Sequence, residues 1–500
     1  MPRRLFGPLV AVACTVGLLG GAATAGAYPV LVLGPGGHAV VRENPFLPKV
    51  GLTPEPSPAP VPRGTPRAPA GVRAHAAASQ VTIASTLTEL RRAGAITASA
   101  SARDHAILEA AIRTAARLRG TRALELYSIL TNMHHMAVAG QLTPSRLPVL
   151  FLTLEHNRQW WSTGPLLTWG QRVQFAGSQL VWEYYPGQGI ALQVLGSFGQ
   201  ADGLYTAGPA SYGKLQQLMG ELIPLAVHRA GALVWEYYFN FDGGRPPWVS
   251  AMAQGTALEA LTRSYEAFHD PSYLSLAAQA LPLFSAAPPA GVRIATARGT
   301  RYLQYSFAPA TSIINAFLQS LIGLYDYARV SGNATAQRLF NDGNAEAMAE
   351  VPHFDTGGWS LYQPGEEDSL SYHQLVTGFL HELCSRTQAD VYCTTADDFE
   401  ADLRTPPALT LKTHRSRVGV LTDVHFWLSK ESRVGIVETY KGATLFATST
   451  ELGYGSNSLG IPTPRHPGPY TVRLSATDLA GNFHRIVGTL EVAPAPRKRH

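Results

Sequence analysis

The sequence predicts a mainly α-helical protein, an (α/α) toroid of helical hairpins, followed by a C-terminal all-β sandwich. Two observations support this: an aromatic motif recurs ahead of helical segments, and apolar and polar residues alternate after position 405. At 500 residues the chain is long enough for more than one hydrophobic core. We expect a signal peptide at 1–27, an extended segment and linker at 28–78, the toroid at 79–400 and the sandwich at 406–494.

The first 27 residues have the pattern of a secretory signal peptide. Arg3 and Arg4 precede an apolar run from Leu5 to Leu19, and the small residues 25–27 suit a cleavage site. No later stretch approaches about 18 consecutive apolar residues, so the mature chain is expected to carry no membrane span. The sequence therefore predicts a secreted, extracytoplasmic bacterial protein.

Two cysteines remain in the mature chain, Cys384 and Cys393, and export favours a disulfide between them. The net charge of +5 suits an acidic polymer as partner, whereas no stripe of Lys and Arg indicates nucleic-acid binding. The histidines are scattered without a paired i, i+4 motif, so no metal site is expected.

The segment before the aromatic motif divides into three parts. Tyr28–Leu33 and His38–Arg42 flank a Gly/Pro turn and predict a hairpin. Residues 52–72 are rich in Pro and Ala, as linkers are. Small and apolar residues at helical spacing then predict helices at Ile96–Leu118, Ala123–Ala139 and Pro144–Arg158.

The aromatic motif has four copies, each an aromatic residue with a tyrosine three positions later. The pairs are Trp182 and Tyr185, Trp235 and Tyr238, Tyr302 and Tyr305, and Trp359 and Tyr362. Gly/Pro-type breakers and a predicted helix follow each copy, at 189–198, 249–268, 311–330 and 371–384. The repeat predicts stacked hairpins with four tyrosines at equivalent mouths of an inner ring of helices. A cleft with such aromatic faces suits a sugar chain.

Two copies contain adjacent tyrosines, of which one is expected to pack and the other to face the cleft. We assign Tyr185 and Tyr238 to sugar stacking. Glu183 and Glu236 occupy matched positions in the repeat, which favours a structural role over the paired carboxylates of a glycoside hydrolase.

After Pro406, period-two alternation predicts short strands. They are Ala408–Thr413, Val418–Leu428, Val434–Thr439, Ala443–Thr448, Tyr470–Ala476 and Phe483–Val492. The ending "YTVRLSATDLAGN" resembles immunoglobulin-like modules of bacterial exported enzymes, which implies an immunoglobulin-like sandwich. Two roles stay open for it, attachment to carbohydrate or cell wall and a passive spacer.

Four blocks between Gly243 and Cys384 resemble the C-terminal helical domain of the D-glucuronyl C5-epimerase family. The blocks are "PWVSAMAQG" (247–255), "SIINAFLQSLIGLYDYA" (312–328), "VPHFDTGGWSLY" (351–362) and "SYHQL" (371–375). The resemblance implies an (α/α) barrel, no cofactor and a glucuronate-containing polysaccharide as substrate.

By position within these blocks, the family's catalytic tyrosines correspond to Tyr305, Tyr362 and Tyr372. The sequence departs from the family at two points. The glutamate expected before the first tyrosine is Gln304, and the arginine expected three residues after the second is Gly365.

Inversion at C5 of a uronate needs acid/base groups on opposite faces and a neutralising group at the carboxylate. We assign proton transfer to Tyr305 and Tyr372, with Tyr362 binding or assisting. The candidates for neutralising the carboxylate are Arg245, Arg301 and His373, with Asn315 as a hydrogen-bond donor. Gln304 is a further substrate-binding candidate. The preferred interpretation is an exported uronate C5-epimerase-like enzyme. A polysaccharide lyase, or a polysaccharide-binding protein that has lost catalysis, is the alternative.

Overall fold

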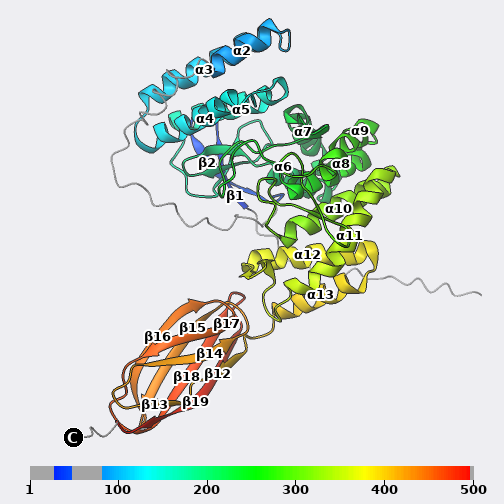
Figure 1. Cartoon of the computed structure of the whole chain (residues 1–500). Coiled ribbons are helices and arrows are strands. Elements are labelled where there is room, and N and C mark those ends of the chain that lie inside the picture. The colour runs from blue at the N-terminus through cyan, green and yellow to red at the C-terminus, as the bar shows by residue number, and fades with distance from the viewer. Residues whose placement is uncertain (1–27, 48–80, 496–500) are drawn as a thin grey trace, which may run out of the picture.

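The computed structural model describes residues 28–47 and 81–495 (Figure 1). The expected signal peptide and the Pro/Ala-rich linker lie outside the described residues. Across the described part of the chain, every helix is too short or too polar to span a bilayer.

Helices dominate the part of the structure before residue 402, with short strands between them. The helices are α2 (Ile83–Arg92), α3 (Ala98–Arg117), α4 (Gly120–Val138), α5 (Leu147–Thr163), α6 (Val194–Thr206), α7 (Tyr212–Leu222), α8 (Ala251–Phe268), α9 (Pro271–Ala280), α10 (Ile314–Ser331), α11 (Ala334–Glu350), α12 (Leu370–Thr387) and α13 (Asp390–Asp402). The short strands here are β6 (Val227–Arg229), β7 (Ala232–Val234), β8 (Arg293–Ala295), β9 (Thr300–Tyr302), β10 (Leu361–Gln363) and β11 (Glu366–Glu367). The three helices predicted ahead of the aromatic motif correspond to α3, α4 and α5.

Four helices, α6, α8, α10 and α12, lie side by side in chain order, and we call them the inner helices. Each is followed by a helix that packs back against it, which gives the hairpins α6–α7, α8–α9, α10–α11 and α12–α13 (Figure 1). Glycines permit close contact between α8 and α10. A Cβ at Gly255 would meet the backbone of Ser320, and one at Gly323 would meet the backbone of Gly255.

The helix predicted at 189–198 is wrong in its first half. Gly189–Leu192 forms strand β5, and α6 begins only at Val194. Two contacts explain the extended backbone: β5 pairs with β4 (Trp182–Tyr185), and the Asn157 side chain bonds both the N–H and the C=O of Ile190. Because each backbone group has a partner outside a helix, the apolar run is stable as a strand.

The predicted N-terminal hairpin is present as β1 (Tyr28–Leu33) and β2 (Ala39–Asn44). It belongs to a larger sheet of order β2-β1-β3-β4-β5, where β3 is Arg172–Phe175. Strand β1 pairs in parallel with β3, whereas the other pairs are antiparallel. The N-terminal segment therefore supports the strand that carries Tyr185.

Residues 408–493 form two sheets, and we call this part the C-terminal β module. One sheet has the order β12-β14-β17 and the other β13-β19-β18-β15-β16. The strands are β12 (Leu409–Leu411), β13 (Arg415–Arg417), β14 (Thr422–Leu428), β15 (Ser432–Tyr440), β16 (Ala443–Leu452), β17 (Gly455–Ile461), β18 (Gly468–Asp478) and β19 (Phe483–Ala493). Buried apolar residues of both sheets share one core, separate from the core of the helical part. An immunoglobulin-like identity for this module stays a prediction.

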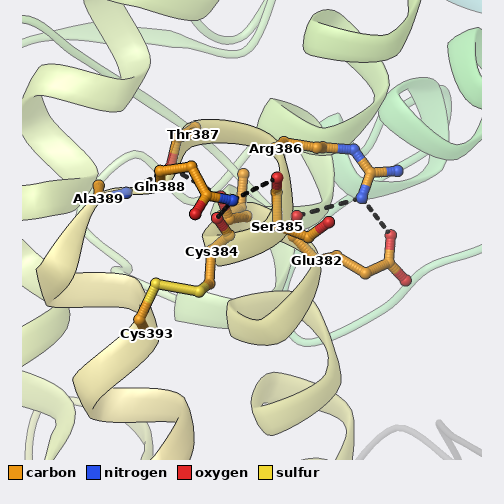
Figure 2. Close-up of a disulfide and its surroundings, with 9 residues drawn as sticks. Glu382, Cys384, Ser385, Arg386, Thr387, Gln388, Ala389 and Cys393 are labelled. Atoms are coloured by element: carbon orange, nitrogen blue, oxygen red, sulfur yellow. Dashed lines mark hydrogen bonds and ion pairs between the residues drawn. A yellow bond between two sulfur atoms is a disulfide. The ribbon is translucent and has the colours of Figure 1, made fainter. Parts of the chain in front are cut away.

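The disulfide expected between Cys384 and Cys393 is present and joins the end of α12 to α13 (Figure 2). Its two half-cystines are 9 residues apart in sequence. Beside it, Arg386 forms ion pairs with Glu382 and with Asp326 of α10. These contacts connect the last hairpin to its neighbour.

Candidate active site

A cavity of about 470 Å³ lies along one face of each inner helix. The inner helices contribute lining residues at helical spacing, as α8 does with Met252, Thr256, Glu259 and Arg263. Residues 45–47, directly after β2, and the segments that precede the inner helices complete the lining. The repeat of strand or loop followed by helix therefore builds one shared cavity.

The three tyrosines assigned to catalysis all line this cavity. Tyr305 lies between β9 and α10, Tyr362 lies in β10, and Tyr372 lies in the first turn of α12. The rings of Tyr362 and Tyr372 meet edge to face, with centroids 5.4 Å apart. The segments are thus brought together as the sequence predicted, whereas the catalytic roles themselves stay predictions.

Tyr305 accepts hydrogen bonds from Tyr362 and from Gln304, and both bonds lower the pKa of Tyr305. Burial outweighs them and leaves that pKa raised. Burial also raises the pKa of Tyr362, and the hydrogen bond to Tyr305 raises it further. Of these two phenols, Tyr305 is therefore the one whose ionised form is better stabilised.

Gln304 is oriented by a second contact. Ser250, the N-cap of α8, donates through Oγ to Gln304 Oε1 at 3.4 Å. With its carbonyl directed at Ser250, the side-chain amide presents its N–H groups to Tyr305. Glutamine at this position is therefore a neutral donor to the Tyr305 oxygen.

Tyr185 lines the cavity as expected. Tyr238 does not line it, so the assignment of Tyr238 to sugar stacking is wrong. Tyr238 is buried and donates to Glu236 Oε2 at 3.0 Å, away from the cavity. Its neighbour Tyr237 lines the cavity instead. Gln193 joins the two lining tyrosines, because it donates to Tyr185 Oη (2.9 Å) and accepts from Tyr237 Oη (3.2 Å).

The first aromatic residue of every motif copy packs in the interior. Trp182, Trp235, Tyr302 and Trp359 are fully buried. The two motif glutamates are buried as well, and each has an arginine partner: Arg172 Nε lies 2.9 Å from Glu183, and Arg146 Nε lies 2.7 Å from Glu236. Both contacts agree with the structural role expected for these carboxylates.

Of the remaining predicted contacts, Gln304 and Asn315 line the cavity, whereas Arg245, Arg301 and His373 do not. Arg245 is exposed on the loop before α8. Arg301 forms an ion pair with Glu350 of α11, because β9 directs it toward that outer helix.

His373 does not line the cavity, and both of its ring nitrogens are used in contacts within the protein. Its Nδ1 accepts from the Ser360 N–H at 2.9 Å, and its Nε2 donates to the Phe399 carbonyl. Burial lowers its pKa to about 4, so the ring is neutral at pH 7. His373 therefore holds the chain two residues before Tyr362.

Arg172, on β3, is a buried cavity-lining arginine that was not predicted from the sequence. Its charge and that of Glu183 both act on Tyr372, which locates the pair near that phenol. Gly196 of α6 makes room for it, since a Cβ there would collide with Arg172 Nη1. Arg172 stands ten residues before the aromatic motif, without a local pattern that marks it.

The far end of the cavity, toward the C-terminal ends of the inner helices, is acidic. Asp202, Glu259 and Glu382 contribute carboxylates, and Arg263 forms ion pairs with Asp202 and Glu259. Burial raises the pKa of Glu259 to about 7, although Arg263 opposes the shift. In the described part of the chain, no group of three or more His, Cys, Asp or Glu side chains has a metal-binding arrangement.

Residues 230–401 match the family model of the D-glucuronyl C5-epimerase C-terminus. That range contains all three tyrosines that meet in the cavity. In this range, which we call the epimerase-like segment, the chain is similar to the C-terminal part of D-glucuronyl C5-epimerases. Arg172 and Tyr185 lie outside the epimerase-like segment and reach the cavity from the sheet.

Two curated relatives are similar to part of the chain. The chain is 36% identical over 130 residues to the D-glucuronyl C5-epimerase of Caenorhabditis elegans, covering 23% of this chain and 21% of that protein. It is 26% identical over 168 residues to an uncharacterised protein of Methanocaldococcus jannaschii, covering 32% and 54%. The chain thus spans about a fifth and about half of the lengths of these relatives.

Solved structures resemble the chain loosely. A cellobiose 2-epimerase from Spirochaeta thermophila aligns over 56% of this chain and 72% of its own, with 12% identity and a TM-score of 0.34. An unsaturated glucuronyl hydrolase from Bacillus sp. GL1 aligns over 42% and 60%, with 14% identity and a TM-score of 0.29. Likeness at this level assigns no activity.

Proposed function

We propose that this protein is an exported C5-epimerase that inverts glucuronate residues within a polysaccharide. One observation carries the proposal: Tyr305, Tyr362 and Tyr372, which come from separate sequence blocks, line one cavity together with a buried arginine. The match of residues 230–401 to the family model of the D-glucuronyl C5-epimerase C-terminus supports the same reaction class.

The reaction begins with removal of the C5 proton, which is acidified by the adjacent carboxylate. Tyr305 suits the base, because hydrogen bonds from Tyr362 and Gln304 favour its phenolate. The phenolate takes the proton and becomes a phenol, and the electron pair of the C–H bond moves into an enolate on the carboxylate. Arg172 supplies the positive charge that this enolate needs.

Tyr372 completes the inversion by donating a proton to the opposite face of C5. Burial raises its pKa, so it is a neutral phenol before reaction and has a proton to give. Tyr362 contacts both other tyrosines, by a hydrogen bond to Tyr305 and by its ring to Tyr372. Tyr305 then loses its proton to solvent and Tyr372 regains one, which restores the starting state.

The charge distribution in the cavity supports an orientation of the substrate. Carboxylates dominate the far end, whereas Arg172 lies near Tyr372. Arg172 is ion-paired to Glu183 at 2.9 Å, so a uronate carboxylate shares this arginine with Glu183. In this orientation the polymer lies across the tyrosine end, where Arg172 and the three tyrosines line the cavity.

Product analysis tests the proposal against the two alternatives. The purified chain is incubated with unsulfated glucuronate polymers, heparosan included, and the products are examined by proton NMR and ultraviolet absorbance. Iduronate without unsaturated chain ends is the expected result. Unsaturated ends would instead make the protein a lyase, which shares the first step but expels the 4-linked sugar. Binding without either product would make it a polysaccharide-binding protein.

A further inference from the structure

The C-terminal β module contacts the loop that carries Tyr362, in addition to being joined to α13 through residues 403–407. We propose that the module is a positioning element for Tyr362 and acts mainly through Glu367. This inference rests on the proposed function, since it assigns a role to the module in the same reaction. It replaces both a passive spacer and a carbohydrate-attachment module as the role of residues 408–493.

Glu367 connects the loop to two turns of the module. Its Oε1 accepts the N–H of Glu431, between β14 and β15, at 3.2 Å. Its Oε2 accepts the N–H of Tyr454, between β16 and β17, at 2.9 Å. In the β10–β11 hairpin, Glu367 is paired with Leu361, the neighbour of Tyr362. One carboxylate thus joins two turns of the module to the strand pair that holds Tyr362.

Trp359 makes a second connection three residues before Tyr362. Its ring is fully buried, its Nε1 donates to the Glu431 carbonyl at 3.2 Å, and Lys430 Nζ lies 4.4 Å from the ring centroid. The Lys430 ammonium is in turn fixed by an ion pair with Asp478 at 2.9 Å. Gly358 fits closely against the same turn, since a Cβ there would collide with the Ser429 carbonyl.

On its other side the loop is held by α12. His373 of α12 accepts from the Ser360 N–H, and within the loop Ser360 Oγ donates to Asp368 at 2.7 Å. The hairpin itself has only two residue pairs, with an irregularity between them. A strand pair this short has little rigidity of its own. The position of Tyr362 therefore depends on contacts from both sides, α12 and the C-terminal β module.

If the module positions Tyr362, loss of its contacts should lower turnover rather than substrate binding. A displacement of about 1 Å in a catalytic group can lower turnover about a hundredfold. The other tyrosines and Arg172 are held by the helical part and the sheet, so most contacts to the substrate persist when the module's contacts to the loop are lost. Loss of Glu367 is thus expected to lower kcat much more than it raises KM.

Point variants of the full chain test this. Glu367→Ala removes both acceptors, whereas Glu367→Gln keeps one carbonyl acceptor. The control is His484→Ala, because His484 Nδ1 donates to the Pro407 carbonyl at 2.7 Å and so attaches the module to the connecting segment without touching the loop. For each variant, kcat and KM are measured for conversion of the glucuronate polymer, and hydrogen exchange is followed at the amides of residues 359–368.

We expect Glu367→Ala to lower kcat by about ten- to a hundredfold with KM within about twofold, and to speed amide exchange in residues 359–368. Glu367→Gln is expected to lie between it and the unchanged chain, and His484→Ala to match the unchanged chain in both readouts. Equal kcat in Glu367→Ala and His484→Ala, or unchanged amide exchange in Glu367→Ala, would overturn the inference. If the unchanged chain converts no polymer, the proposed function fails, whereas the exchange data still decide whether Glu367 holds the loop.

Discussion

The ring of Tyr362 meets the ring of Tyr372 edge to face, 5.4 Å between centroids, although one lies on a short hairpin and the other in a helix. The contact joins the two proposed acid/base positions through a shared neighbour, because Tyr362 also hydrogen-bonds Tyr305. Tyr362 thus connects the proposed base, Tyr305, with the proposed acid, Tyr372, within one cavity.

Removal of one phenol should abolish turnover while the fold is retained. We expect Tyr305→Phe and Tyr372→Phe each to lower the rate of C5 epimerisation by at least about a hundredfold, since positioned acid/base groups contribute about 10²–10⁴-fold. Tyr327→Phe is the matched control, because Tyr327 is buried and donates to the Leu274 carbonyl outside the cavity. Initial rates and thermal unfolding of all three variants check this, and full activity of Tyr372→Phe would remove that residue from the site.

The rate should rise with pH through the alkaline range. The pKa of Tyr305 is raised by burial, so only a small fraction is phenolate at pH 7, and this fraction grows about tenfold per pH unit. We expect log kcat/KM to increase with a slope near one between about pH 7 and 9. Initial rates over that range, with circular dichroism to establish folding, provide the measurement. A bell-shaped profile centred near pH 6 would point to a different base.

Displacement of Arg172 should weaken substrate binding. In Gly196→Ala the new methyl group occupies the space of Arg172 Nη1. We expect KM for the polymer to rise by about tenfold or more, as for the loss of a hydrogen bond to a charged group. Gly213→Ala in α7 is the control, because a Cβ there meets no atom within 4 Å. If both variants bind the polymer equally well, Arg172 is not a substrate contact.

The disulfide should contribute stability but not catalysis. Cys384 and Cys393 close a small loop, which constrains the unfolded chain by about 2–3 kcal/mol. The double variant Cys384→Ser/Cys393→Ser should therefore lower the free energy of unfolding in urea by about that amount. Neither cysteine lines the cavity, so the variant should keep its rate at temperatures where it is folded. A large loss of rate in the folded variant would show that the end of α12 affects the site.

The local signals in the sequence were sufficient for the helical hairpins and the three tyrosines. Helical spacing predicted α3, α4 and α5, and the sequence blocks identified Tyr305, Tyr362 and Tyr372, which do line one cavity. Two strands of the C-terminal β module were not predicted, because β13 is Arg-Ser-Arg and β17 is rich in Gly and Ser. Their pairing is decided by partner strands distant in sequence.

The errors at the site have a common physical cause, which is that partners distant in sequence decide where a side chain points. Tyr185 and Tyr238 hold the same place in the motif, but only Tyr185 lies in a strand, β4 of the sheet β2-β1-β3-β4-β5. Around Tyr238 the chain forms only an isolated bridge at Tyr237, so the side that faces the cavity shifts by one residue. Arg301 is directed to Glu350 for a similar reason.

Hydrogen exchange at C5 of the substrate tests directly whether the protein removes this proton. The purified chain is incubated with heparosan in D2O, and the C5–H signal of glucuronate is followed by proton NMR. We expect loss of this signal as iduronate appears, and exchange at least about a hundredfold slower in the Tyr305→Phe variant, which lacks the proposed base. Retention of the C5–H signal with the unchanged chain, on heparosan and on other unsulfated glucuronate polymers, would contradict the proposed function.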